Sequence, residues 1–290
     1  GSLPVLNKGV VEKAMAVGLA TNCKINLRSK MDRKNYVYPD LAKAYQISQF
    51  EIPICKDGFV ELSSGKKIRI NRIHMEEDAG KLVHNGGDVY IDYNRGGVPL
   101  IEIVTEPDIS SSDEAKEYVE KLQNILRYAG VSDCKMQEGS MRCDVNISVK
   151  PEGSEKFGTR TEIKNMNSIT FMTKAIDYEY ERQIDLVESG EEVIQQTLRY
   201  CEATNSTESM RSKEDAQDYR YFRDPDLVEI VLTEEEVEKI KESLPEMPGD
   251  RLKRYVSELG IPEKDAMHLT KYKNVSDFFE KACEGLKSAK

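Results

Sequence analysis

Three consecutive carboxylates stand in the segment 72–81, whose sequence is RIHMEEDAGK. They are Glu76, Glu77 and Asp78, and they follow a stretch with the pattern of a strand. Hard divalent cations bind carboxylate oxygens, and Mg²⁺ commonly takes one or two from protein and the rest from water and phosphate. In an extended segment Glu76 and Asp78 point to one side and Glu77 to the other. Glu77 is therefore a candidate metal ligand, and a solvated acidic turn is the alternative.

A further carboxylate, Glu102, stands inside the apolar run 100–104. Such a carboxylate is either on the wet face of a strand or buried and paired. As a functional residue, Glu102 would join Glu77 from a neighbouring strand, and the two carboxylates would share one ion within about 6 Å. The turn Arg95–Gly97 before it lets backbone amides approach a phosphate, although adjacent glycines are a weak signal.

Charged residues also alternate along two later segments. Asp144 lies on the polar face of the first, and Glu162 and Lys164 share a face of the second. Together they suit a metal-bound nucleotide, and an ordinary solvated sheet face is the alternative. The sequence contains no Walker A, G-x-S-x-G, H-E-x-x-H or C-x-x-C pattern. Its three histidines are too few and too scattered for a zinc site, and His74 is interpreted as structural.

Helices and strands must position these side chains. Helical spacing and capping residues predict helices over 10–22, from the capping box at Ser111 to Gly130, and over 168–188. Strands are predicted at 45–50, 58–62, 67–75, 88–93, 100–104, 141–149, 158–164 and 227–232. The period of two in the third strand fails at Arg72, so we expect the strand to end or bend there. Strands and helices in no regular alternation indicate an α+β fold.

The pattern of the sequence changes near residue 225, from strand-like to helical segments. A capping box at Thr233 and Glu236 starts a run of short helical segments punctuated by proline. We therefore expect one strand-rich domain over 1–232 and the start of a small helical domain over 233–290. Gly1-Ser2 is typical of tag removal, so we expect a chain cut from a longer protein at both ends.

Composition narrows the class of protein. The 290 residues are 39% hydrophobic and 32% charged, which allows a core and excludes a disordered chain. No stretch approaches the roughly 20 apolar residues that span a bilayer. Six scattered cysteines without a close pair predict reduced thiols in the cytoplasm.

The formal net charge of −10 argues against diffuse attraction to nucleic acid. RNA binding would then need a local basic patch. The run 24–34 is one candidate, with the basic residues Lys24, Arg28, Lys30, Arg33 and Lys34. An ordinary solvated strand is the alternative.

Long contiguous motifs point to a family. They are DRKNYVYPD at 32–40, KAYQISQ at 43–49, HMEEDAGK at 74–81, PLIE at 99–102, GSMRCDVN at 139–146 and DYRYF at 218–222. These runs closely resemble GatB, a component of the aspartyl/glutamyl-tRNA amidotransferase family, from about Leu3 to the end of the chain. Runs of this length are far more specific than any single short pattern.

The resemblance implies a fold, partners and a reaction. The fold is a glutamine-synthetase-like cradle with a mostly antiparallel sheet, followed by an all-α domain. The partners are an amidase subunit (GatA), a small subunit (GatC) and misacylated tRNA, in a cytoplasmic ligase. ATP and Mg²⁺ activate the side-chain carboxylate of Glu-tRNA(Gln) or Asp-tRNA(Asn), and ammonia released from glutamine then forms the amide.

The resemblance also implies roles for individual residues. Glu77 and Glu102 would bind Mg²⁺, and Asp144 and Glu162 are weaker candidates for the catalytic and nucleotide site. Charge and placement add Lys34, Arg95 and Lys164 as contacts to phosphate or carboxylate. The family's Gly-Leu-Glu-x-His motif and its tRNA-gripping tail have no counterpart in this sequence, so we expect the isolated chain to be inactive.

Two other interpretations stay open at this point. One is a non-catalytic scaffold that binds tRNA and whose carboxylates are structural. The other is a two-metal nuclease or phosphatase that uses the same acids.

Overall fold

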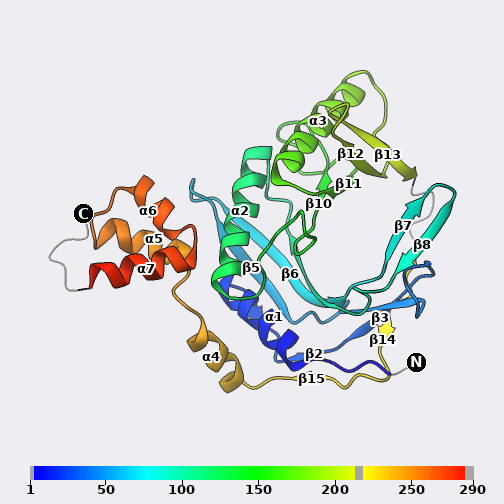
Figure 1. Cartoon of the computed structure of the whole chain (residues 1–290). Coiled ribbons are helices and arrows are strands. Elements are labelled where there is room, and N and C mark those ends of the chain that lie inside the picture. Colours follow the sequence, from blue (N-terminus) through cyan, green and yellow to red (C-terminus); the bar gives the residue numbers. More distant parts are fainter. Residues whose placement is uncertain (1–2, 213–217, 285–290) are drawn as a thin grey trace. The chain divides into compact units, whose positions relative to one another are not determined.

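Helices and strands follow one another without a repeating order along residues 3–212 and 218–284, the part of the chain that the computed structural model describes (Figure 1). That part contains seven helices and several mostly antiparallel sheets, so the predicted mixture of strands and helices is confirmed. The single parallel pair among the described strands joins β11 (Thr161–Met166) and β12 (Gln196–Cys201).

The helices are α1 (Lys8–Ala20), α2 (Ser112–Tyr128), α3 (Ile169–Glu188), α4 (Glu234–Ser243), α5 (Pro248–Ser257), α6 (Glu263–Thr270) and α7 (Lys273–Cys283). The first strands are β1 (Lys24–Ile25), β2 (Arg28–Ser29), β3 (Asp32–Asn35), β4 (Tyr45–Ser48), β5 (Cys55–Glu61), β6 (Lys67–Glu77), β7 (Lys81–Asn85) and β8 (Asp88–Asp92). The others are β9 (Pro99–Thr105), β10 (Cys143–Ile147), β11 (Thr161–Met166), β12 (Gln196–Cys201), β13 (Ser206–Ser212), β14 (Phe222–Arg223) and β15 (Ile230–Val231). Each helix and strand predicted from the sequence is present, with bounds shifted by a few residues.

Contacts divide the chain into two units. The first comprises residues 1–108, 124–131 and 217–290, and the second comprises residues 109–123 and 132–216. This division does not test the domain boundary predicted near residue 233, which stays a prediction.

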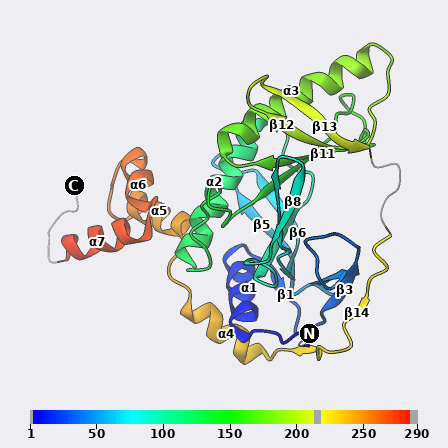
Figure 2. The ribbon, with the colours of Figure 1, turned by 45° about the vertical axis from the view of Figure 1, so that its right-hand side comes forward.

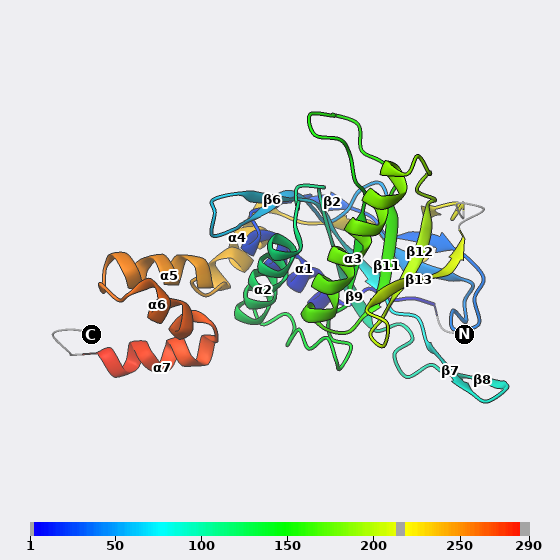
Figure 3. The ribbon, with the colours of Figure 1, turned by 90° about the horizontal axis from the view of Figure 1, so that it is seen from above.

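The central sheet of the first unit has the strand order β1-β5-β6-β9. Strand β6 alternates buried Ile68 and Ile70 with exposed neighbours, so one face packs into the core while the other meets solvent. Helix α1 covers the buried face with Ala14 and Val17, both fully buried (Figure 2). Strands β7 and β8 pair only with each other and form a ribbon that extends from this unit (Figure 3).

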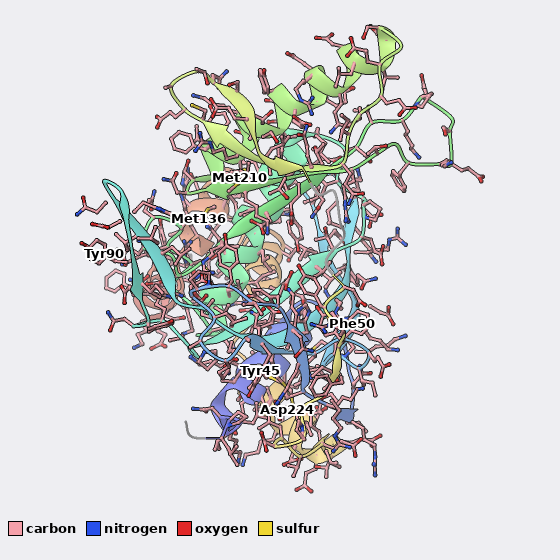
Figure 4. The ribbon with its side chains drawn as sticks, turned by 90° about the vertical axis from the view of Figure 1, so that its right-hand side faces the viewer. Tyr45, Phe50, Tyr90, Met136, Met210 and Asp224 are labelled. Atoms are coloured by element: carbon pink, nitrogen blue, oxygen red, sulfur yellow. The ribbon has the colours of Figure 1, made fainter. Side chains whose placement is uncertain are left out.

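A small three-stranded sheet, β14-β3-β4, joins parts of the first unit that are far apart in sequence. Arg33 of β3 holds it together, because its guanidinium donates to Asp224 at 2.8 Å and to Asp226 at 2.8 Å. The same group lies 4.1 Å from the centre of the Tyr45 ring. Figure 4 labels Tyr45 and Asp224 in this part of the molecule.

The second unit is a four-stranded sheet, β10-β11-β12-β13, with α3 packed on one face (Figure 1). Ile163 and Leu198 point into that interface, together with Met172 and Ala175 of the helix. Helix α3 begins where Ser168 caps the Phe171 amide at 3.1 Å and ends before Gly190, as the sequence predicts.

Beyond residue 233 the described chain is helical, with α4 to α7 and no strand after residue 245. Tyr255, Ile261 and Ala266 form a small apolar cluster there. Among all described residues, no helix has the length and apolar character needed to cross a membrane.

Helix α4 depends strongly on its first turn, because it has ten residues and none of them is buried. Thr233 accepts from the Glu236 amide at 3.1 Å while the Glu236 carboxylate accepts from the Thr233 amide at 2.9 Å, a complete capping box. We expect Thr233→Ala to lower the local stability of α4 by about 1 kcal/mol, measured as faster amide hydrogen exchange over 237–243. Thr233→Ser should retain the protection; equal loss in both variants would contradict the role of the cap.

Candidate active site

The pairing of β6 with β9 brings carboxylates from both strands together. His74 stands directly opposite Glu102 in the ladder, and Glu76 lies two residues further along the same face of β6. The Nε2 atom of His74 is 3.1 Å from Glu102 Oε2 and 3.3 Å from Glu76 Oε1. One ligand atom from each of the three residues lies within 4.8 Å of the other two. We call this group the carboxylate cluster.

Local structure decides which acid joins Glu102. Strand β6 does not end at Arg72; the irregularity expected there is a register shift of the β6–β9 ladder between Ile70 and Arg72. Beyond the shift, His74 and Glu76 lie on the same face of the sheet as Glu102. Glu77, the last residue of β6, points to the opposite face.

Glu77 has partners of its own. Its Oε1 atom accepts from the Ile47 amide at 3.1 Å and forms an ion pair with Lys43. The expected combination of Glu77 with Glu102 is thus not the one found in the carboxylate cluster, which contains Glu76. The metal-binding role of Glu77 itself stays a prediction.

Glu76 is held in place by the neighbouring strand β4. Ser48 Oγ donates to Glu76 Oε1 at 2.7 Å, and Gln46 Nε2 lies 3.4 Å from Oε2. A carboxylate fixed by hydrogen bonds on both oxygens keeps its orientation without reorganisation when a ligand arrives.

Arg72 determines how His74 acts. The Nε atom of Arg72 donates to Nδ1 of His74 at 3.1 Å, while its NH1 group donates to the Phe50 carbonyl at 2.6 Å. Because Nδ1 accepts this hydrogen bond, the neutral ring carries its proton on Nε2 and donates it to the carboxylates. His74 therefore orients Glu102 and Glu76 as a hydrogen-bond donor, while the lone pair on its Nδ1 atom accepts from Arg72.

Hydrogen bonds and charges around the cluster shift the pKa of His74 and the pKa of Glu102. Burial acts to lower the pKa of His74, but the hydrogen bonds to Glu102 and Glu76 outweigh it and raise that pKa above its ordinary value. The hydrogen bond from His74 lowers the pKa of Glu102 below its ordinary value against the effect of burial, and Lys34 and Arg72 add to the lowering. Glu102 is thus a carboxylate at neutral pH.

The donor set fits a hard divalent cation. Glu76 and Glu102 offer two carboxylates, the number that Mg²⁺ commonly takes from protein, and the half-exposed Glu102 leaves room for water and phosphate oxygens. His74 stands behind them as a hydrogen-bond donor, an arrangement that commonly orients metal ligands.

Lys34 of β3 lies in the electrostatic neighbourhood of Glu102, because its charge lowers the pKa of that carboxyl. Its Nζ atom is also 4.7 Å from the centre of the Tyr219 ring. The charge of Lys34 therefore acts on Glu102, although the two residues are far apart in sequence.

Arg95 stands in the turn before β9. Its Nε atom donates to Asp78 Oδ2 at 3.0 Å, and the Gly97 amide donates to the Asp78 carbonyl at 2.9 Å. Gly97 has a φ of +79°, which an L side chain rarely adopts. Arg95 is thus paired with the acid that follows β6, and contact to a phosphate stays a prediction.

The other predicted residues lie in the second unit. Lys164 Nζ is 3.5 Å from Asp144 Oδ2 and 3.4 Å from Glu162 Oε1, on the sheet face opposite α3. Burial acts to lower the pKa of Lys164, but the two carboxylates outweigh it and raise that pKa. The three side chains meet as the alternation predicted, and their part in catalysis stays a prediction.

The basic run 24–34 does not form a free positive patch. Arg28 pairs with Glu229 at 3.2 Å, Lys30 with Asp32 and Glu51, and Arg33 with Asp224 and Asp226. Most of these acids come from sequence far outside the run. Arg28, Lys30 and Arg33 are thus each paired with at least one acid, and contact of the run with RNA stays a prediction.

Comparison with known proteins identifies the family. Residues 1–238 match the family model described as the GatB/GatE catalytic domain. The chain belongs to this family. The GatB resemblance of the motifs is confirmed.

Curated relatives agree with this assignment. The chain is 57% identical to GatB of the aspartyl/glutamyl-tRNA(Asn/Gln) amidotransferase from Thermoanaerobacter sp. (strain X514), over 97% of this chain and 60% of the relative. It is 55% identical to the protein of the same name from Caldanaerobacter subterraneus subsp. tengcongensis, over 100% of this chain and 62% of the relative. The chain thus spans about 60% of the length of the GatB relatives it matches.

Proposed function

We propose that this chain is the catalytic part of a tRNA-dependent amidotransferase subunit, a ligase that uses ATP to activate the side-chain carboxylate of misacylated Glu-tRNA(Gln) or Asp-tRNA(Asn). The names of its relatives support the amidotransferase role. The observation that carries the chemistry is the fixed pair of carboxylates, Glu76 and Glu102, with Lys34 close by.

The reaction explains why such a site is useful. A carboxylate is a poor electrophile, and transfer of the γ-phosphoryl group from ATP to one of its oxygens creates an acyl phosphate and releases ADP. Ammonia then attacks the acyl carbon, forms the amide and displaces phosphate. Phosphoryl transfer depends mainly on positioning and on neutralising charge. Glu76 and Glu102 would hold a divalent cation, which would supply that neutralisation.

The chain's own residues have separate tasks in this proposal. Glu76 and Glu102 hold Mg²⁺, and Glu77 is retained as a third candidate ligand. His74 and Arg72 orient the two carboxylates. Lys34 attracts the incoming phosphate or carboxylate.

The proposal includes four further residues. We propose that Arg95 contacts a phosphate and that Asp144, Glu162 and Lys164 belong to the nucleotide site. Arg95 is paired with Asp78, and Lys164 is paired with Asp144 and Glu162. A ligand must therefore displace or extend these contacts.

We further propose the architecture and partners that the family resemblance implies. Residues 1–232 form a glutamine-synthetase-like cradle, and residues 233–290 begin an all-α domain. The full-length protein works in the cytoplasm with an amidase subunit, GatA, that releases ammonia, and with a small subunit, GatC.

The decisive experiment is amidation by the full-length protein with its partner subunits. Glu-tRNA(Gln), glutamine and Mg²⁺ are supplied with and without ATP, and Gln-tRNA(Gln) is measured. We expect product only with ATP, together with one ADP per amide formed. ATP-independent amidation would overturn the ATP-dependent activation, and tRNA binding without any product would favour the non-catalytic scaffold.

Lys34 gives a more specific prediction. Lys34→Ala should lower the rate of carboxylate activation about tenfold to hundredfold, because a cation aimed at developing charge is lost. The affinity for tRNA should change little. Lys24→Ala, an exposed lysine of β1, is the matched control and should leave the rate unchanged. Unchanged ADP release in Lys34→Ala would remove Lys34 from the active site.

A further inference from the structure

Four aromatic side chains form a continuous row beside the carboxylate cluster. Tyr36 meets Tyr219 edge-on at 6.0 Å between ring centres, and Tyr219 meets Tyr221 in the same way, also at 6.0 Å. Tyr221 is stacked on Phe50 at 4.3 Å with the planes 8° apart. These are the geometries that aromatic pairs prefer, so the four rings support one another. We call them the aromatic row.

The backbone holds the aromatic row in place. The side-chain amide of Asn35 donates to the carbonyls of Tyr219 at 3.2 Å and Arg220 at 2.8 Å, and the Asn35 amide N–H donates to the Tyr219 carbonyl at 3.0 Å. Arg72 donates to the carbonyl of Phe50. The rings therefore come from segments that are fixed at both ends of the row (Figure 4 labels Phe50).

Charged groups flank the aromatic row on the side of the cluster. Burial, followed by the charge of Glu76, raises the pKa of Tyr221 to about 12. Burial, followed by the charges of Asp40 and Glu76, raises the pKa of Tyr36 to about 12. The charge of Glu76 thus acts on both tyrosines. Lys34 lies over the ring of Tyr219.

The outer end of the aromatic row is open. Phe50 is 51% exposed although one face of its ring is covered by Tyr221. A ring that is half exposed while stacked on another ring can take a further flat ring in the same stack. The nearby cations and carboxylates do not suit an extended apolar partner, but they do suit a planar group that carries a phosphate.

We propose that the aromatic row, with Phe50 as its outer face, is the stacking site for an unpaired adenine base. Stacking on aromatic side chains is the general way in which proteins hold unpaired bases. The inference rests on the proposed function, because that reaction brings two adenosines to this place, one in ATP and one at the 3′ end of the tRNA. In ATP, the phosphates attached to the stacked base would extend toward Lys34, which lies over Tyr219.

Ring-removing and ring-keeping variants test the site in the full-length protein assembled with its partners. Phe50→Leu and Tyr221→Leu remove a ring, whereas Phe50→Tyr and Tyr221→Phe keep it. Tyr180→Leu, a tyrosine of α3 that is 52% exposed, controls for the loss of a ring elsewhere. Circular dichroism and assembly with the partners verify that each variant is folded.

Two pairs of probes separate the two sources of adenine. The first pair is ATP and inorganic tripolyphosphate, and the second is tRNA with and without its 3′-terminal adenosine. We expect the leucine variants to bind one adenine-bearing probe about tenfold more weakly, with the ring-keeping variants close to wild type. Tripolyphosphate and the shortened tRNA should bind equally to all variants.

The probe that responds identifies the source of the base. Unchanged affinity of both leucine variants for both adenine-bearing probes would overturn the stacking site, and so would an equal loss for the probes that lack adenine. If the wild-type complex amidates with ATP while adenine affinity is unaltered, only the stacking site is wrong. If the wild-type complex shows no ATP-dependent amidation, the proposed function is wrong.

Discussion

Glu102→Gln should lower ATP-dependent amidation by the full-length complex about a thousandfold. The change removes one negative charge from the carboxylate cluster but keeps the size of the side chain and an oxygen that accepts from His74 Nε2. The fold should therefore persist while the site loses half of its charge for a divalent cation. Loss of a group that acts on developing charge typically costs two to three orders of magnitude, about 10²–10³.

Two activities need to be measured in this variant. Release of ammonia from glutamine by the partner amidase should remain measurable, because Glu102 takes no part in it. Glu106→Gln is the matched control: that carboxylate follows the same strand but accepts from Asn71, outside the cluster, at 2.6 Å. Loss of both activities in a well-folded Glu102→Gln complex would assign Glu102 to assembly and not to chemistry.

Glu179→Ala should lower the free energy of unfolding by about 3–5 kcal/mol, the usual cost of removing one partner of a buried charge pair. Glu179 of α3 is fully buried. Its carboxylate accepts from Arg182 at 2.7 and 2.8 Å, from Gln183 at 3.0 Å, and from Thr161 and Thr207 at 2.9 Å each. Its removal leaves several donors without an acceptor and detaches the helix from two strands.

Chemical denaturation measures the total loss, and amide hydrogen exchange in α3 and β11 locates it. Glu181→Ala is the control, since Glu181 is exposed on the same helix and should change stability by less than about 0.5 kcal/mol. A similar stability of both variants would show that the buried network contributes little.

The dependence on pH follows from the pKa of Glu179. Burial acts to raise that pKa, but the hydrogen bonds from Arg182 and Gln183 outweigh it and lower the pKa. A carboxyl with a lowered pKa in the folded state stabilises the fold above its unfolded pKa, about 4.3, and loses that contribution as the pH falls through the folded value. The gap in stability between wild type and Glu179→Gln should therefore shrink below about pH 4.3.

Elements that depend on neighbouring residues were predictable from the sequence. The caps at Ser168 and Thr233 lie within three residues of the groups they satisfy, and the structure shows both. The alternation that places Asp144 on a solvent-facing side of β10 also involves only adjacent positions.

The carboxylate cluster was only partly predictable. The failed alternation at Arg72 marked an irregularity, but a register shift and a strand end look alike in sequence. His74 was interpreted as structural, and its spacing of two from Glu76 was the signal that both share a face with a residue of the next strand. Glu102 and Lys34 were identified as site residues, but their proximity depends on the packing of separate sheets.

Partners far away in the chain could not be predicted from local sequence. The acids that pair with Arg33 follow it by 191 and 193 residues. Tyr219, which lies against Lys34, is similarly far along the chain. Only the folded arrangement reveals that the basic run is paired and that a row of rings stands beside the cluster.

The pairing of β14 with β3 also constrains how the protein is made. Arg33 leaves the ribosome long before Asp224 and Asp226, so for most of translation its guanidinium has neither acid available. The segment with Tyr219 and Tyr221 likewise cannot join Tyr36 until the residues up to 223 have been synthesised. Contacts of such long sequence separation close late and slowly. The nascent chain therefore completes its central β-sheet early but acquires the aromatic side of the site only near the end of synthesis.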